Sequence, residues 1–91
     1  MREAATYPLV IPIDTNRGRG ETRRIGPTRV TFSTAAEFEA GDDIRFALSL
    51  HGTGTTPLDV FCSGSVRSVA AEGELFVVDA AISETRIALR E

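Results

Sequence analysis

The sequence contains no lysine and no tryptophan, and it has one cysteine, Cys62, and one histidine, His51. A single cysteine excludes an internal disulfide, and Cys62 lies in the strand-like run LDVFCSGSV, so we expect a buried structural thiol. His51 falls in a glycine-threonine segment, which favours an exposed loop position. No run approaches the ~18 apolar residues of a membrane-spanning helix, and the start MREAATYPLV lacks the apolar stretch of a signal peptide. We therefore expect a cytoplasmic protein.

Paired catalytic groups are also lacking. The carboxylates of Asp42, Asp43, Asp59 and Asp79 show no spacing that indicates a general acid and base or a metal site. Asp79 interrupts an apolar run, so we expect it to face outward from a strand. The sequence therefore predicts a protein that is not an enzyme and that uses no metal or cofactor.

The length and composition indicate one folded domain. Ninety-one residues have room for a single thin core, so we expect one domain over residues 1–91. The hydrophobic fraction of 42% and the charged fraction of 25% are those of a folded domain. The net charge of −3 argues against nucleic acid as the main partner, because such binding depends on cationic groups.

The hydrophobic pattern has a period of two along most of the chain, which is typical of half-buried antiparallel strands. Alternating runs occur at residues 9–13, 30–34 and 44–50, and runs rich in valine and phenylalanine occur at residues 58–69 and 74–82. The pattern predicts an all-β fold of five or six antiparallel strands. A small barrel would remove most of the exposed edges of such a sheet.

The segments between these runs are short. AAEG predicts a tight turn between the last two runs, and HGTGTTP predicts a hairpin loop rather than a phosphate loop, since it has no lysine and precedes a strand. TAAEFEAGD is too short for an amphipathic helix, so we expect a loop from which Phe38 reaches the core. Pro8 and Pro12 place the first strand at a sheet edge or at the rim of a barrel.

The basic residues are concentrated in one stretch. All ten are arginine, and five of them are close together: Arg17, Arg19, Arg23, Arg24 and Arg29. An acidic patch follows: Glu37, Glu39, Asp42 and Asp43. The planar guanidinium group suits phosphates and carboxylates, so the stretch is either an anion site or a solvated hairpin without a binding function.

Taken in order, these patterns resemble the PilZ family, small bacterial six-stranded barrels that bind cyclic di-GMP and pass the signal to a partner. The resemblance runs from about Tyr7 to Ile82, through YPLVIPI, GETRRIGPTRVTFST, EFEAGDDIRFALSL, DVFCSGSVRSV and ELFVVDAAI. GDDIRFALSL is similar to the family's strand after a glycine-acidic turn, and CSGSVRSV to its next strand. The resemblance implies a small six-stranded antiparallel β-barrel, of the PilZ-like split type, and a regulatory role in signalling.

The family's two ligand motifs are changed in this sequence. Arg-x-x-x-Arg falls on residues 2–6, where Arg2 is kept and the second arginine is replaced by Thr6. Asp/Asn-x-Ser-x-x-Gly falls on residues 24–29, where Arg24, Gly26 and Arg29 replace the acidic or amide residue, the serine and the glycine. In the family these residue types grip phosphates and guanine edges and let the backbone approach the ligand. We therefore expect cyclic di-GMP binding to be lost or severely weakened.

Two further hypotheses stay open. The first is a working cyclic di-GMP receptor whose rearranged arginines recruit the phosphates. Its candidate ligand-binding residues are Arg2, Arg19, Arg23, Arg24, Gly26 and Arg29. The second is a small barrel that binds single-stranded nucleic acid, although its phenylalanines fall in the core phase. For the degenerate domain we expect a protein partner, no membrane insertion, and a homodimer if an uncovered strand edge is available.

Overall fold

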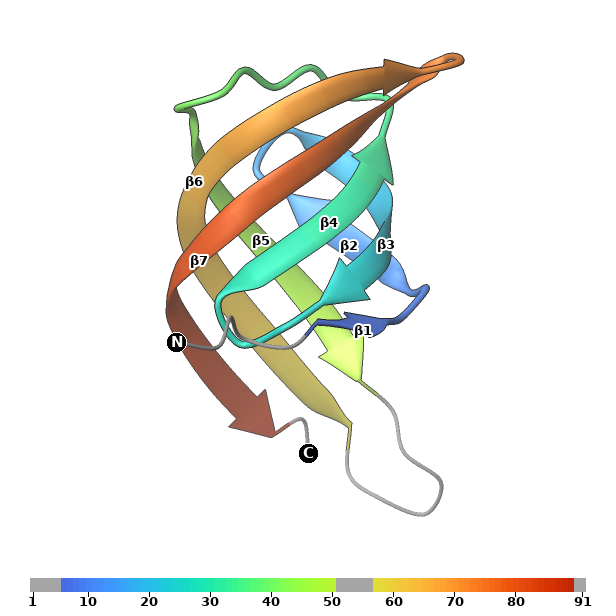
Figure 1. The fold of residues 1–91 in the computed structure, drawn as a ribbon. Coiled ribbons are helices and arrows are strands. Elements are labelled where there is room, and N and C mark those ends of the chain that lie inside the picture. Colours follow the sequence, from blue (N-terminus) through green and yellow to red (C-terminus); the bar gives the residue numbers. More distant parts are fainter. Residues whose placement is uncertain (1–5, 51–56, 90–91) are drawn as a thin grey trace.

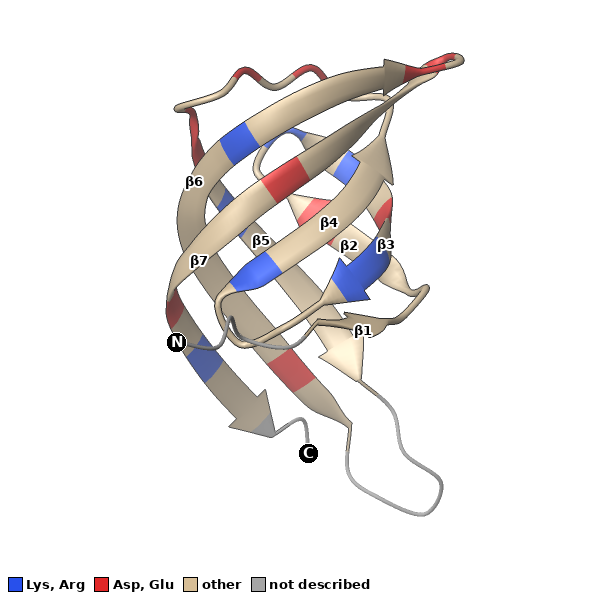
Figure 2. Ribbon diagram, viewed as in Figure 1, with Lys and Arg blue, Asp and Glu red and all other residues tan. Residues whose placement is uncertain are grey.

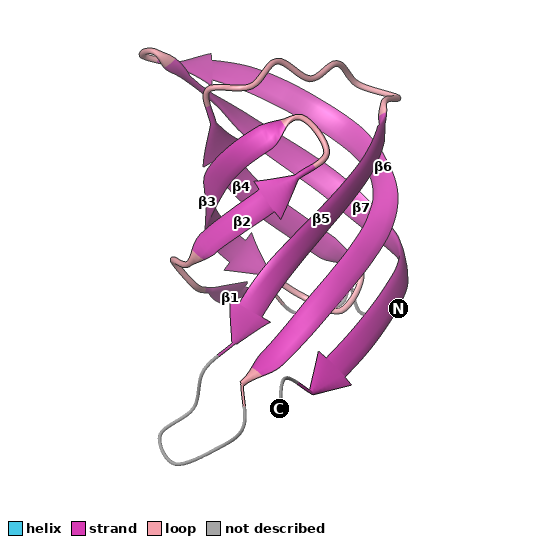
Figure 3. Cartoon of the chain, turned by 180° about the vertical axis from the view of Figure 1, so that it is seen from behind, coloured by secondary structure: helices cyan, strands magenta, loops and turns pink. Residues whose placement is uncertain are grey.

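The structure is a computed structural model that describes residues 6–50 and 57–89. Its elements are β1 (Tyr7–Pro8), β2 (Pro12–Thr15), β3 (Gly18–Ile25), β4 (Arg29–Thr34), β5 (Asp43–Leu50), β6 (Leu58–Glu72) and β7 (Leu75–Leu89). Strands and short connections make up all of the described part of the chain, as the view from behind shows (Figure 3). No helix long and apolar enough to cross a membrane occurs in that part.

Six of the strands close into an antiparallel barrel. The order around the barrel is β3-β2-β5-β6-β7-β4, and β4 pairs with β3 to complete the ring (Figure 1). β1 adds to β3 outside this ring through Tyr7 and Pro8. The predicted small six-stranded antiparallel β-barrel is therefore confirmed. The expected edge position holds for Pro8 in β1, whereas Pro12 begins β2, a strand of the ring.

The inward phase of the alternating runs fills the barrel. The buried apolar residues are Ile13, Val30, Phe32, Phe38, Ile44, Phe46, Leu48, Cys62, Val66, Val78 and Ala80. Phe38 reaches this core from the loop after β4, as predicted, and its ring meets Phe32 edge to face at 6.0 Å. The sequence therefore places its apolar groups on one face of each strand, and closure of the sheet brings these faces together.

The first predicted strand, residues 9–13, is broken into two pieces, so that prediction was wrong. Residues 9–11 separate β1 from β2, because the Thr22 side chain of β3 binds Ile11 N and Leu9 O, while Leu9 N and Ile11 O bond to backbone groups of β3. The Thr22 hydroxyl accepts a hydrogen bond from Ile11 N at 3.0 Å and donates one to Leu9 O at 2.5 Å. A regular ladder is thus replaced at this point by a buried threonine, which fixes the segment leading to β1.

Replacing Thr22 by valine keeps the side-chain volume but removes both hydrogen bonds. Since an unpaired buried polar group costs about 1–3 kcal/mol, we expect the free energy of unfolding to fall by about 2 kcal/mol. Chemical denaturation measures this change. Thr31→Val on β4 is the matched control, because Thr31 is only partly buried; its change is expected to stay within about 0.5 kcal/mol. Equal changes in the two variants would show that the Thr22 hydroxyl does not hold this segment.

β3 was not predicted as a strand, and β7 is longer than predicted. The inward positions of β3 carry Gly20 and Thr22 rather than large apolar residues, so the alternation is invisible in GRGETRRI. β7 continues beyond Ile82 to Leu89 through the polar run SETR. Both strands are specified by pairing with their neighbours rather than by their own hydrophobic pattern.

The connections agree in part with expectation. The turn between β6 and β7 lies at Gly73 and Glu74, slightly after the predicted AAEG, and Gly73 supplies the positive φ of 63° that the turn requires. His51 and most of the predicted HGTGTTP loop lie outside the described residues.

The seam between β2 and β5 is the shortest in the barrel. Only Asp14 and Thr15 of β2 pair with Ala47 and Phe46 of β5 in the described residues, whereas β6 pairs along the whole of β5. A hollow of about 500 Å³ opens beside this seam, between Ile11 and Leu50. The ring is therefore closed at this seam by a short ladder, and the split form that the resemblance implied stays a prediction.

Candidate ligand-binding site

The described end of the first expected ligand motif, Thr6, lies beside the first residue of the second, Arg24. Arg24, the first residue of the second motif, donates from Nε to Thr6 Oγ1 at 3.0 Å and from NH2 to Thr6 O at 2.9 Å. Thr6 is the last residue of the first motif, and Arg2 lies outside the described residues. The ends of the two motifs are therefore adjacent, and the arginine at one end binds the threonine at the other.

The second motif forms the turn between β3 and β4. Gly26 N donates to Arg29 O at 2.8 Å, which closes the turn around Pro27 and Thr28. Pro27 has no N–H, so this turn offers few backbone donors to an anion. Gly26 therefore serves the hairpin, whereas the family has a serine hydroxyl at this position.

Arg29 occupies the place of the motif's final glycine and is held by a carboxylate. Its Nε and NH2 donate to the two oxygens of Asp79 at 3.0 and 2.6 Å. Asp79 lies on the outward face of β7 between buried Val78 and Ala80, and its side chain is 19% exposed. This bidentate pair directs the guanidinium toward β7.

Arg23 is paired in the same way with Glu72 at the end of β6. Its NH1 and NH2 donate to the Glu72 carboxylate at 3.2 and 2.6 Å. The hydrogen bond from Arg23 lowers the pKa of Glu72, and the same bond raises the pKa of Arg23. Because the carboxyl pKa is lowered, the pair contributes fully above the ordinary value of 4.5 and is lost as the pH falls through the folded-state value.

The two remaining arginines of the stretch are also bound to carboxylates. Arg19 Nε donates to Asp14 Oδ1 at 2.9 Å. Arg17 NH1 donates to Asp42 Oδ2 at 2.8 Å, and its guanidinium lies over the Phe38 ring at 5.2 Å. One of these arginines, Arg17, therefore pairs with Asp42 of the acidic patch.

The five arginines do not form one cationic surface. Basic positions are spread over several strands of the barrel and are interspersed with acidic ones (Figure 2). Four of the five are in ion pairs with Asp42, Asp14, Glu72 and Asp79, and the fifth, Arg24, holds Thr6. An anion at this site would have to compete with carboxylates of the chain itself.

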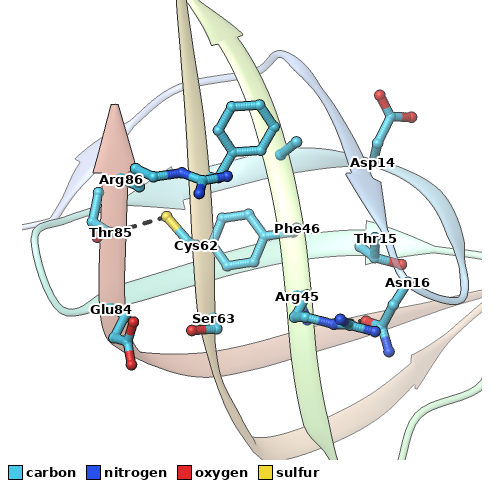
Figure 4. A pocket seen from close by; sticks show the side chains of 12 residues that line it. Asp14, Thr15, Asn16, Arg45, Phe46, Cys62, Ser63, Glu84, Thr85 and Arg86 are labelled. Carbon is cyan, nitrogen blue, oxygen red and sulfur yellow. Dashed lines mark hydrogen bonds between the residues drawn. The ribbon is translucent and has the colours of Figure 1, made fainter. Parts of the chain in front are cut away.

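The structure also has a hollow that the sequence patterns did not indicate. It has a volume of about 490 Å³ and is lined by residues of β2, β5, β6 and β7, among them Arg45, Phe61 and Arg86 (Figure 4). Ala47 of β5, which is paired with Phe61 of β6, also lines it. Most of its lining residues come from four separate strands, so no short sequence motif could have predicted the hollow.

Cys62 lies at one wall of this hollow and is buried, as predicted. Its sulfur is 3.7 Å from Thr85 Oγ1. Burial raises the pKa of the Cys62 thiol above its ordinary value of 9.0, and the contact with Thr85 lowers it by less. The thiol is therefore protonated and poorly nucleophilic at neutral pH.

Thiol labelling tests this assignment. If labelling requires a local opening of about 3 kcal/mol, Ellman's reagent will react with Cys62 about 100-fold more slowly in the native protein than in urea. The pKa of the Cys62 thiol is higher in the folded than in the unfolded protein. Its contribution to the free energy of unfolding is therefore complete below about pH 9 and declines as the pH rises through the folded-state pKa. Equal labelling rates in the native and unfolded protein would contradict a buried structural thiol.

Comparisons with known proteins support the fold. No family model matches the sequence, and no curated protein matches it. Among solved structures, the chain is similar to the Bacillus subtilis inhibitor of motility MotI/DgrA, a PilZ-domain protein, with a TM-score of 0.81 and 15% identity. The fold is PilZ-like. The alignment covers 94% of this chain and 44% of MotI/DgrA, so the chain spans less than half the length of that protein.

Proposed function

We propose that this chain is a PilZ-like regulatory or interaction domain whose cyclic di-GMP site is degenerate and which acts through a protein partner. The observation that carries the proposal is the Arg24–Thr6 contact. It joins the positions of the two ligand motifs through residues that differ from those the family uses there. The PilZ-like fold, which the chain shares with an inhibitor of motility, favours a regulatory domain over an enzyme.

The expected loss of affinity follows from the replaced groups. Three hydrogen bonds to charged or strongly polar groups, at ~1.5–3 kcal/mol each, amount to about 4.5 kcal/mol or more. Since each ~1.4 kcal/mol is a factor of ten, a micromolar site becomes millimolar or weaker. Binding to Arg29 would also require its bidentate pair with Asp79 to break.

A melting scan with and without cyclic di-GMP tests the proposal. At about 1 mM ligand, a site with a dissociation constant of ~10 µM adds about 2.7 kcal/mol and raises the melting temperature by about 10 °C or more. A millimolar site adds only about 0.4 kcal/mol, so we expect a shift of about 3 °C or less.

A double variant, Arg23→Ala with Arg24→Ala, separates the two ligand hypotheses. If the original chain shows the large shift and the double variant does not, the chain is a receptor with a rearranged arginine site, and the degenerate-site proposal is wrong. The same small shift in both proteins agrees with a lost site and directs the search to protein partners.

A further inference from the structure

The last part of β7 has one edge that no described strand covers. β4 pairs with Phe76–Ala81 of β7, and a hydrogen bond from Ile82 N to Thr28 O follows on that side. From Ser83 to Leu89, β7 pairs with β6 alone among the described residues, and the dark red end of the ribbon continues past β4 (Figure 1). The open backbone groups of such an edge are a template for pairing with another strand.

The side chains on this edge carry both signs of charge. Glu84 and Arg86 are two residues apart and project from the same outer face, where Arg86 lies over the Phe61 ring at 5.2 Å. The Glu84 side chain has no hydrogen bond or ion pair with the described residues, although its backbone is paired with Ser63 of β6. Ile87 lies on the other face of β7, the face that is directed toward the barrel core, and is paired with Val60. Its side chain is nevertheless 61% exposed. The edge thus presents an unpaired carboxylate, a cation and an uncovered apolar side chain.

The sequence of this edge is self-complementary about Thr85. When two antiparallel copies are paired with Thr85 opposite Thr85, Glu84 of each copy lies opposite Arg86 of the other. Opposite-charge pairs and threonine pairs at directly opposed positions stabilise antiparallel sheets. The exposed Ile87 of each copy then lies diagonally beside Thr85 of the other, within reach of its methyl group.

We propose that this chain forms a two-fold symmetric homodimer by antiparallel pairing of the Ser83–Ile87 edges of β7. Both ion pairs form by symmetry, because an isologous contact repeats every interaction twice. The neighbouring registers are disfavoured: centring the pair on Glu84 or on Arg86 places like charges directly opposite each other. The charges therefore select one register as well as one partner, a second copy of the chain.

Sedimentation analysis of the purified chain tests the dimer. Between about 10 and 500 µM, the range suited to a small interface, we expect the mass to rise from 9.8 kDa toward twice that value. A mass that stays at 9.8 kDa throughout would overturn the proposal and would leave Glu84 and Arg86 as charges that protect an edge from pairing.

Two single variants and their mixture test the register. Glu84→Arg and Arg86→Glu each place like charges opposite in a homodimer, so we expect each to raise the dimer dissociation constant at least tenfold. Mixed in equal amounts, they restore opposite charges at both positions and are expected to form a heterodimer about as tight as the original dimer. Both side chains are exposed, so the melting temperature at low concentration serves as the folding control. Dimers that persist in each single variant, or a mixture that stays monomeric, would show that this edge is not the interface.

Discussion

Replacing Gly64 by alanine is expected to destabilise the barrel by about 3 kcal/mol and to lower the melting temperature by about 15 °C. A Cβ at Gly64 would overlap the carbonyl oxygen of Ala81 and would lie 3.1 Å from the Cα of Ile82. Both contacts are with backbone atoms of the paired strand, so a rotamer change cannot relieve them. The new methyl group forces β6 and β7 apart at the register shift beside Gly64.

Thermal and denaturant unfolding of Gly64→Ala measure this effect, with Ser65→Ala as the control on the same strand. Ser65 is partly buried and its replacement removes one oxygen without adding volume, so we expect a change within about 0.5 kcal/mol. A Gly64→Ala variant as stable as the Ser65→Ala variant would show that the two strands do not approach each other as closely as described.

Replacing Phe32 by alanine is the second substitution with a large expected effect. Phe32 is fully buried at the centre of the core, and its ring meets Phe38 at 6.0 Å. Truncation removes this packing and leaves a cavity, which typically costs about 3–5 kcal/mol. Since the total stability of a small domain is about 5–15 kcal/mol, such a loss removes a large share of it.

Phe61→Ala is the matched control for Phe32→Ala. Phe61 is 39% exposed and contacts the guanidinium of Arg86 on the outer face of the barrel. We expect this variant to lose no more than about 1 kcal/mol, measured by denaturant unfolding at low protein concentration. Comparable losses for the two phenylalanines would mean that Phe32 does not occupy the core described for it.

The strands that the sequence predicted are those that put large apolar residues inward. β4 and β5 alternate phenylalanine, isoleucine, valine and leucine with polar residues, so their existence and their buried faces follow from the pattern. β3 escaped prediction because Gly20 packs against the backbone of Ser33, where a side chain would not fit, and Thr22 is polar. A close backbone approach or a buried hydrogen bond leaves no periodic hydrophobic pattern in the sequence, so a strand that depends on them is not predicted.

The candidate ligand-binding residues stay a prediction, but the partners of the arginines can be compared with the sequence. The resemblance gives the two motif positions as residues 2–6 and 24–29, and among the described residues Arg24 contacts Thr6. The partners of the arginines could not be predicted, because Glu72 and Asp79 lie about fifty residues away in the chain from Arg23 and Arg29. Only closure of the barrel brings these charges together.

Isothermal titration of cyclic di-GMP into the purified chain tests the central claim most directly. The chain has a PilZ-like barrel, and its arginines bind carboxylates and Thr6 of the same chain. We predict no saturable heat in the micromolar range from a sample that melts cooperatively. Saturable heat with a dissociation constant below ~10 µM would contradict the account and would make the chain a cyclic di-GMP receptor.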